Sequence, residues 1–215
     1  MLLTYKETQK LLEKYGLPYA RELLCRDADE VLGRAHGLDY PLVLKVLSRE
    51  THKTDKGLVR TGIHDAFDLR REVSKLERLV KREKLKQAGL LLQEQVKGAE
   101  FIVGAKADPT FGKVMLFGLG GVFVELLKQK SIRVLPVARE ELESMLYDTE
   151  ASRFFAGYRG LKVAEKPVLA LIEKAAKLVE RENISELDFN PVIANEKSAL
   201  IVDARVVLQD GKRKA

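Results

Sequence analysis

Four short apolar stretches follow one another closely between residues 101 and 136, and this succession limits the folds open to the chain. The segments DPTFG, GLGG and KQKS separate them and supply the glycine, proline, aspartate and serine residues that tight turns favour. Strands joined by connections this short pair as antiparallel neighbours. The pattern therefore predicts an antiparallel sheet, with strands near residues 101–107, 113–117, 122–127 and 132–136.

Two helices and a last pair of strands are expected in the rest of this C-terminal half. Amphipathic periodicity predicts helices at about 138–147 and 165–182, the second with Pro167 in its first turn. Strands at 188–194 and 199–206 are separated by NEKS and predict a hairpin.

The order of helices and strands expected in the first half of the chain predicts a smaller lobe. A helix at about 5–15 ends at Gly16 and Pro18, and helices capped by Asp27 and Asp65 follow. The expected elements after the first helix are a strand at 19–25, a helix at 28–36, the strand YPLVLKVLS, a strand at 54–63, a helix at 67–87 and a strand at 90–96. This order of helices and strands is typical of a compact α+β lobe.

Together these elements predict an α+β (α/β) protein of two lobes. The larger lobe would comprise residues 1–18 and 97–215, and the smaller lobe residues 19–96. The boundary is expected near 96–98, where VKG follows without a true linker. Because lobes that share a short hinge leave a cleft between them, we expect the ligand to bind there.

Composition narrows the class of protein. The 215 residues, 46% of them apolar, suffice for a sizeable core. No run of eighteen apolar residues occurs and MLLTYKETQK lacks the apolar segment of a signal peptide, so a soluble, cytoplasmic protein is expected. The single Cys25 excludes an internal disulfide and suits a reducing compartment.

The net charge of +6 raises the possibility of a nucleic-acid partner. Acids alternate with the bases along residues 70–87, however, where the charges form the solvated face of an amphipathic helix. Neither interleaved aromatic residues nor zinc-finger spacing accompanies them. We therefore expect neither a nucleic acid nor a membrane as partner.

The segment ELDFNPV, residues 186–192, carries polar side chains on a strand that otherwise has a buried pattern. Asp188 and Asn190 share one face of such a strand, and Asp203 in ALIVDARV could lie opposite them. Two carboxylates and an amide oxygen form the hard-oxygen site that holds Mg²⁺ on nucleotide phosphates. Alternatively, Asn-Pro opens a turn and Asp188 pairs with a neighbouring lysine. The residues alone leave both interpretations open.

Two other residues raise the same question. Lys45 interrupts an apolar strand, so its ammonium either meets an anionic phosphate or reaches solvent from a sheet edge. His52 begins the turn HKTDKG, where it could accept a phosphoryl group as a nucleophile or merely cap the turn. The loop FGLGGVFVE, residues 117–125, matches no helix-based phosphate motif and more often marks a turn.

The order of motifs resembles the β subunit of archaeal ADP-forming acyl-CoA (acetyl-CoA) synthetases, which are ATP-grasp relatives of the succinyl-CoA synthetase β chain. The resemblance covers nearly the whole chain and is most specific in GAKADPTFGKVMLFGLGGVFVE. It also includes YPLVLKVLS, HKTDKGLV, YRG, and ELDFNPV with VDARV. It implies an ATP-grasp fold with a nucleotide cleft between the lobes.

The resemblance implies roles for the nucleotide-binding residues. Lys45 matches the lysine that reaches the phosphates of ADP or ATP. Glu94, Gln95 and Val96 match the segment whose backbone meets the adenine edge, and Glu100 is similar in position to the acid at the ribose.

It implies roles in metal binding and catalysis as well. Asn190 and Asp203, with Asp188 close by, match the Mg²⁺ ligands. His52 resembles the second phosphorylated histidine, which hands phosphate to ADP. HKTDKGL departs from the family pattern, which has two glycines after the aspartate, and its loop is more basic and bulkier.

The implied reaction is acyl-CoA + ADP + phosphate ⇌ acid + CoA + ATP, catalysed by an acid–CoA ligase. A partner α subunit would carry the CoA site and the first phosphohistidine, as part of an α2β2 heterotetramer. Two rival hypotheses are a free-standing ATP-grasp ligase or kinase and a basic RNA-binding or scaffold protein.

Overall fold

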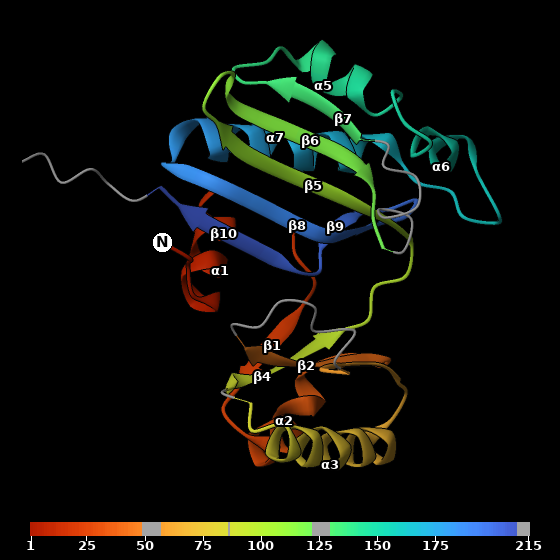
Figure 1. Ribbon diagram of the computed structural model, residues 1–215. Coiled ribbons are helices and arrows are strands. Elements are labelled where there is room, and N and C mark those ends of the chain that lie inside the picture. The colour runs from red at the N-terminus through yellow and green to blue at the C-terminus, as the bar shows by residue number, and fades with distance from the viewer. Residues whose placement is uncertain (49–56, 86, 122–129, 210–215) are drawn as a thin grey trace, which may run out of the picture. The chain divides into compact units, whose positions relative to one another are not determined.

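The computed structural model describes residues 1–48, 57–85, 87–121 and 130–209, and its elements are labelled in Figure 1. The chain divides into two compact units. The larger unit comprises Met1–Tyr19 and Val96–Ala215, and the smaller unit is Ala20–Gln95. Within the described ranges, no helix has the length and apolar character needed to cross a membrane.

The smaller unit is a four-stranded antiparallel sheet in the order β1-β4-β2-β3, with its helices on one side (Figure 1). Its elements are β1 (Glu22–Cys25), α2 (Ala28–Arg34), the 3₁₀ helix η1 (Ala35–Gly37), β2 (Leu42–Ser48), β3 (Val59–Ile63), α3 (Ala66–Arg82) and β4 (Gln87–Glu94). Asp27 and Asp65 cap the two α-helices as predicted, because their carboxylates accept the N–H groups of Glu30 at 2.9 Å and Asp68 at 2.8 Å.

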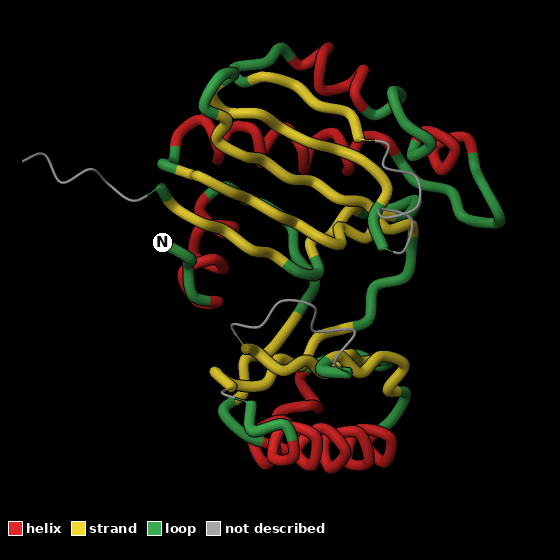
Figure 2. The backbone as a smooth tube through the Cα atoms, in the orientation of Figure 1, coloured by secondary structure: helices red, strands yellow, loops and turns green. Residues whose placement is uncertain are grey.

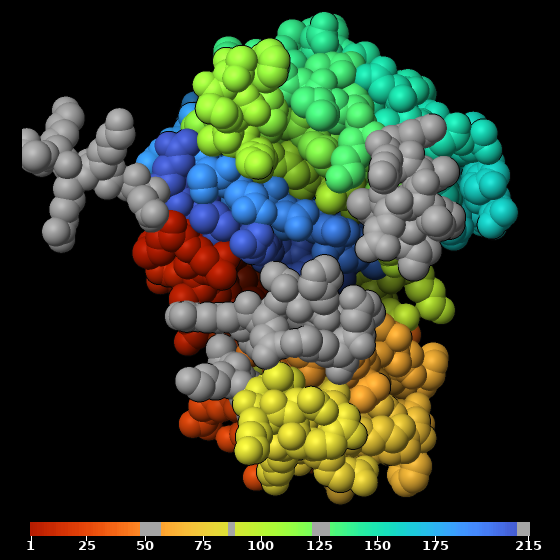
Figure 3. Space-filling model, in the orientation of Figure 1, coloured from red at the N-terminus to blue at the C-terminus, as the bar shows by residue number. Residues whose placement is uncertain are grey.

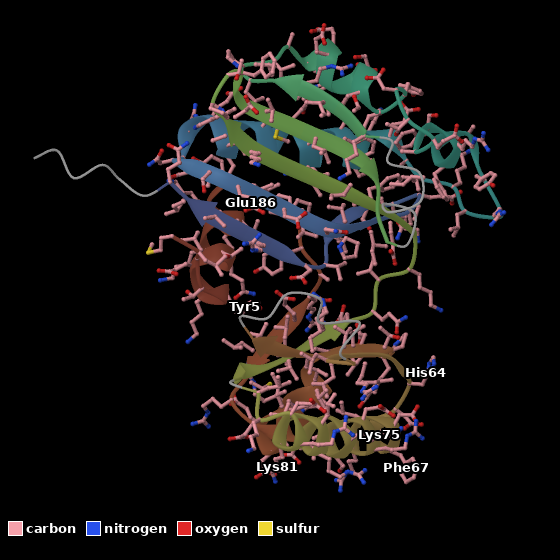
Figure 4. The ribbon with its side chains drawn as sticks, in the orientation of Figure 1. Tyr5, His64, Phe67, Lys75, Lys81 and Glu186 are labelled. Carbon is pink, nitrogen blue, oxygen red and sulfur yellow. The ribbon has the colours of Figure 1, made fainter. Side chains whose placement is uncertain are left out.

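One face of this sheet forms the core of the smaller unit. Alternate residues of β2 and β4 point toward the helices, because side chains alternate between the faces of a strand. The buried residues from the sheet are Cys25, Leu42, Leu44, Val46, Ile63, Leu90 and Leu92, and those from α2 and α3 are Val31, Leu69, Val73 and Leu76. The charged face of α3, which carries Lys75 and Lys81, is turned to solvent (Figure 4).

The larger unit contains a six-stranded antiparallel sheet, traced in Figure 2, with the order β10-β8-β5-β6-β7 and with β9 also paired to β8. Its strands are β5 (Ala99–Asp108), β6 (Gly112–Leu119), β7 (Lys130–Val134), β8 (Ile184–Ala194), β9 (Ala199–Ile201) and β10 (Ala204–Leu208). Its helices are α1 (Tyr5–Lys14), α5 (Arg139–Met145), α6 (Ser152–Ala156) and α7 (Glu165–Arg181).

Helix α7 packs against one face of the larger sheet, behind the strands in Figure 1. Phe101 of β5 is fully buried there, and its ring stacks on Phe117 at 5.5 Å and on Phe155 at 6.1 Å. The opposite face carries side chains of β8 and β10 at the surface of the molecule (Figure 3). The larger sheet therefore has one face for the core and one with polar side chains that remain available for function.

The structure corrects the predicted C-terminal hairpin. The strand expected at 199–206 is split into β9 and β10 at Val202 and Asp203. Val202 lies opposite Pro191 of β8 and donates to its carbonyl at 3.0 Å, and Asp203 lies opposite Asn190. Proline has no N–H to return, so the ladder is interrupted at this point.

Other boundaries also differ from prediction. The helix expected at 67–87 ends at Arg82, because the chain must turn before β4 begins at Gln87. Helix α6 was not predicted, since five residues are too few for a clear amphipathic pattern. The strand predicted at 122–127 lies outside the described residues.

Candidate functional site

Strand β8 and the break between β9 and β10 bring the three predicted metal-binding residues together. Asp188 lies opposite Arg205, and the N–H of Asn190 donates to the carbonyl of Asp203 at 3.1 Å. Their neighbours Leu187 and Phe189 are buried in the core, so Asp188 and Asn190 point to the other face of the sheet. Glu186, labelled in Figure 4, lies on the same face.

The electrostatics of this cluster are unfavourable in the absence of a cation. Burial raises the pKa of Asp188, and repulsion from Asp203 and Glu186 raises it further, while Arg205 and Lys130 act in the opposite direction. Arg205 is engaged by Glu186 in an ion pair of 2.7 Å. Within the described part of the chain Asp188 forms no salt bridge, which argues against the alternative that it pairs with a lysine.

The cluster fits a Mg²⁺ ion in its donor chemistry. A carboxylate that is partly desolvated and repelled by another carboxylate is stabilised when a cation binds between them. The described residues contain no group of three or more His, Cys, Asp and Glu side chains placed to hold a metal. A cation at this site would therefore use the Asn190 amide oxygen beside the two carboxylates, with the other ligands coming from nucleotide phosphates or water.

Lys130 is a residue that the sequence analysis did not select. It begins β7, is exposed, and is close enough to Asp188 to lower the pKa of that carboxyl. The pattern of KSIRV carries no signal for this proximity, because it depends on the pairing of β7 with β6. Lys130 adds a cation to the polar face of the larger sheet.

Lys45 is buried, with an exposed fraction of 7%, in the middle of the smaller sheet. Its strand β2 lies between β4 and β3, and Lys45 is in register with Leu91 and Val59. The flanking Leu44 and Val46 belong to the core cluster on the opposite face. The alternative of a lysine reaching out from a sheet edge is therefore wrong.

The segment predicted to meet the adenine edge follows the end of β4. The N–H of Glu94 donates to the Arg21 carbonyl and that of Gln95 to the Pro41 carbonyl, both at 2.9 Å. The N–H of Val96, by contrast, has no hydrogen-bond partner among the described residues. Of the three backbone N–H groups in this segment, only that of Val96 is thus not engaged within the described residues.

The side chains of the same segment fix its position. The Glu94 carboxylate accepts from the Arg21 guanidinium at 3.1 Å and from the N–H of Asp39 at 3.0 Å. The Gln95 side-chain oxygen accepts from the N–H of Gly62 at 2.7 Å. These bonds hold the backbone in place and engage both side-chain acceptors.

Glu100 is exposed near the start of β5 and lies against the glycine loop. The N–H of Gly120 donates to the Glu100 carbonyl at 2.8 Å. A Cβ atom on Gly121 would lie 2.2 Å from the Glu100 carboxylate, and one on Gly120 would lie 2.9 Å from the Phe101 backbone. Close packing on the β5 backbone thus explains Gly120, whereas Gly121 has a φ of +62°, in the left-handed region that favours glycine.

His52 and most of the segment HKTDKG lie outside the described residues. Its proposed phosphoryl transfer rests on sequence alone.

Comparisons with known proteins extend over almost the whole chain. A family described as an ATP-grasp domain matches residues 1–208. Acetate–CoA ligase [ADP-forming] II subunit beta of Pyrococcus furiosus is 33% identical over 212 residues, which cover 94% of this chain and 90% of that relative. Acetate–CoA ligase [ADP-forming] II of Archaeoglobus fulgidus is 39% identical over 99% of this chain, but the chain spans only 31% of that relative's length.

A solved structure is similar in fold as well as in sequence. It is the dinucleotide forming acetyl-coenzyme A synthetase 1 of Ca. Korarchaeum cryptofilum in complex with coenzyme A and Mg-AMPPCP, with its phosphohistidine segment pointing towards the nucleotide binding site. The TM-score is 0.80 at 32% identity, and the match covers 97% of this chain and 93% of that chain.

Proposed function

The chain belongs to the ATP-grasp family, together with the β subunits of ADP-forming acetate–CoA ligases, and we propose that it is the nucleotide-binding β subunit of an ADP-forming acyl-CoA synthetase. The proposed reaction is acyl-CoA + ADP + phosphate ⇌ acid + CoA + ATP. The observation that carries this proposal is the match to 90% of a separate β subunit from Pyrococcus furiosus at 33% identity. The convergence of Asp188, Asn190 and Asp203 on one sheet face supports it.

In this proposal Asp188, Asn190 and Asp203 hold Mg²⁺ bound to ADP or ATP. The ion would neutralise charge on the phosphates, where phosphoryl transfer depends on positioning and electrostatics. Asp188 and Asp203 supply the negative charge, and their mutual repulsion makes the empty site costly. The ion pair between Glu186 and Arg205 leaves Asp188 available for the cation.

The nucleotide itself would be bound by groups from several elements. We assign Lys45 to the phosphates, the Val96 N–H with the backbone of Glu94 and Gln95 to the adenine edge, and Glu100 to the ribose. The hydrogen bonds at Glu94 and Gln95 support the second assignment, because they hold the backbone in place before the ligand arrives.

His52 is the proposed phosphate carrier. Its imidazole nitrogen would take a phosphoryl group from a phosphohistidine on the partner. The N–P bond would then break as a terminal phosphate oxygen of ADP forms the new O–P bond of ATP. Lys45 would offset the charge on the phosphates during this transfer.

A partner α subunit follows from the lengths of the relatives. The Archaeoglobus fulgidus relative is a single chain of which this sequence spans 31%, whereas the Pyrococcus furiosus relative is called a subunit beta. We propose that the missing functions, the CoA site and the first phosphohistidine, reside on a separate α subunit in an α2β2 complex.

Labelling tests the proposal. The chain is incubated with Mg²⁺ and ATP labelled in the γ-phosphate, beside His52→Ala and the control His64→Ala, which changes an exposed histidine of the smaller unit. We expect acid-labile, base-stable label on the parent and the control and none on His52→Ala. Label on all three proteins would refute the role of His52.

The rival functions predict different results. A free-standing ligase or kinase would complete its reaction without an α subunit. An RNA-binding protein would show salt-dependent affinity for nucleic acid and no response to Mg²⁺ with ADP.

A further inference from the structure

A cationic groove lies in the larger unit, on elements that the proposed nucleotide site does not use. It has a volume of about 320 Å³ and is formed by the end of α1 and the second half of α7. The lining residues are Lys14, Tyr15, Lys174, Lys177 and Arg181. Four of the five side chains are cations.

Part of this groove is fixed by hydrogen bonds within the protein. The Lys14 ammonium donates to the Glu182 carboxylate at 2.5 Å, and the Tyr15 hydroxyl donates to the same oxygen at 2.8 Å. The Lys174 ammonium donates to the Gly16 carbonyl at 2.7 Å. Three lining side chains are therefore held in place before any ligand binds.

The positive charge of the groove is compensated only in part. Glu182 is already engaged by Lys14, and Glu173 is paired with Arg139 at 3.0 Å. Within the described ranges, Lys177 and Arg181 have no ion-pair or hydrogen-bond partner. Like charges gathered in a concave surface raise the local concentration of anions.

Stabilisation of the helix does not account for all of these cations. Basic residues in the last turns of a helix can bond its free carbonyls and favour its dipole. On α7 this is done by Lys113, whose ammonium donates to the carbonyls of Val179 at 2.5 Å and Glu182 at 2.9 Å. Arg181 lies in the last turn of α7, where its charge favours the dipole, but Lys177 lies before that turn and is not explained in this way.

We propose that this groove binds a diphosphate group, at a site separate from the proposed nucleotide site. Lys174 and Arg181 are seven residues apart on α7, or about 10 Å along the helix axis. A single phosphate group is too small to reach both. Lysine ammoniums act on phosphates as point charges, and the guanidinium of Arg181 can bond two oxygens at once. Tyr15 gives the groove an aromatic wall.

The first test is a titration with inorganic pyrophosphate in the presence of EDTA, which removes the divalent ions that the nucleotide site requires. The chain has no tryptophan and six tyrosines, so tyrosine fluorescence can follow binding beside calorimetry. We compare the parent with Lys177→Gln/Arg181→Gln. The matched control is Lys162→Gln/Lys197→Gln, which removes two exposed charges elsewhere in the same unit.

We expect the groove variant to bind pyrophosphate at least about tenfold more weakly than the parent, because each lost charge-assisted bond is worth more than a neutral one. The control should bind like the parent, and the melting temperatures of all three should agree, since the changed residues are exposed. Equal affinity of the groove variant and the parent, or equal weakening in the control, would overturn the proposal.

Two further arms identify the source of the diphosphate and separate this site from the proposed function. If ADP in EDTA shows the same loss in the groove variant, the diphosphate is that of a nucleotide; if only pyrophosphate does, it is the free anion. Lys45→Met should lower the affinity for Mg²⁺·ADP and leave pyrophosphate binding unchanged. Loss of pyrophosphate binding in Lys45→Met would place the anion in the nucleotide site and refute the groove.

Discussion

Replacing Asp188 by asparagine should leave the ligand-free protein as stable as the parent at neutral pH, or more stable. Burial and the charges of Asp203 and Glu186 raise the pKa of Asp188, so folding favours its protonated form. The associated stability is fully present below the ordinary aspartate pKa of about 3.9 and is lost as pH rises through the higher folded value. Because asparagine is neutral at every pH, the variant does not lose this stability as the pH rises.

The same substitution should abolish most of the response to Mg²⁺ and ADP. A ligand at one hundred times its Kd stabilises the folded parent by about 2.7 kcal/mol. A chain of 215 residues shifts its Tm by roughly 2–4 °C per kcal/mol, so the parent should gain about 5–11 °C. If loss of one carboxylate weakens binding a hundredfold, the gain falls to about 0.4 kcal/mol, or roughly 1–2 °C.

Thermal unfolding between pH 4 and 8, with and without Mg²⁺·ADP, measures both effects. The control is Glu186→Gln, which removes an ion pair with Arg205 that is worth about 1 kcal/mol or less because both side chains are nearly half exposed. It keeps Asp188 and Asp203 but releases Arg205 beside Asp188, so it should retain more of the response to the ligand than Asp188→Asn does. Ligand-free Asp188→Asn that is clearly less stable than the parent at pH 7 would show that Asp188 serves in a structural ion pair, and the reasoning would fail.

Three other substitutions test separate parts of the structure. Gly98→Ala would place a Cβ atom 2.2 Å from the Ala194 carbonyl oxygen, so we expect a cost of about 1–3 kcal/mol in urea unfolding, and an unchanged midpoint would contradict the packing of β5 on β8. Lys113→Met removes the ammonium that bonds the last carbonyls of α7, which should cost about 1–3 kcal/mol, whereas the exposed Lys106→Met should cost little. Lys45→Met should retain the circular dichroism spectrum and lose calorimetric binding of Mg²⁺·ADP; undiminished affinity would exclude Lys45 from the phosphate site.

Elements specified by nearby residues could be predicted from the sequence. The caps at Asp27 and Asp65 depend on residues three positions away, and the apolar face of α7 depends on helical periodicity. The split between β9 and β10 depends instead on Pro191, a residue of the partner strand. No pattern within residues 199–206 reveals it.

The candidate site also has some features that nearby residues specify and others that depend on the pairing of distant strands. Asp188 and Asn190 share a face because strands alternate, which the sequence alone predicts. The position of Asp203 beside Asn190 could be known only once the pairing of two strands was known. The approach of Lys130 to Asp188 depends on the order of four strands, β8, β5, β6 and β7. The turn predicted at the glycine loop is present at Gly121, but nothing in the local sequence indicates that Gly120 packs on the backbone of β5.

The insertion of the smaller unit within the larger one has a consequence for biosynthesis. Residues 20–95 are continuous, so the smaller unit can fold as soon as they leave the ribosome. The N-terminal segment must wait, because Leu3 donates to the Val206 carbonyl at 2.9 Å and Tyr19 pairs with Ile201. At 5–20 residues per second, α1 spends about 10–40 s without its partner strands. Of the two units, the one that contains α1 is therefore the last to be completed.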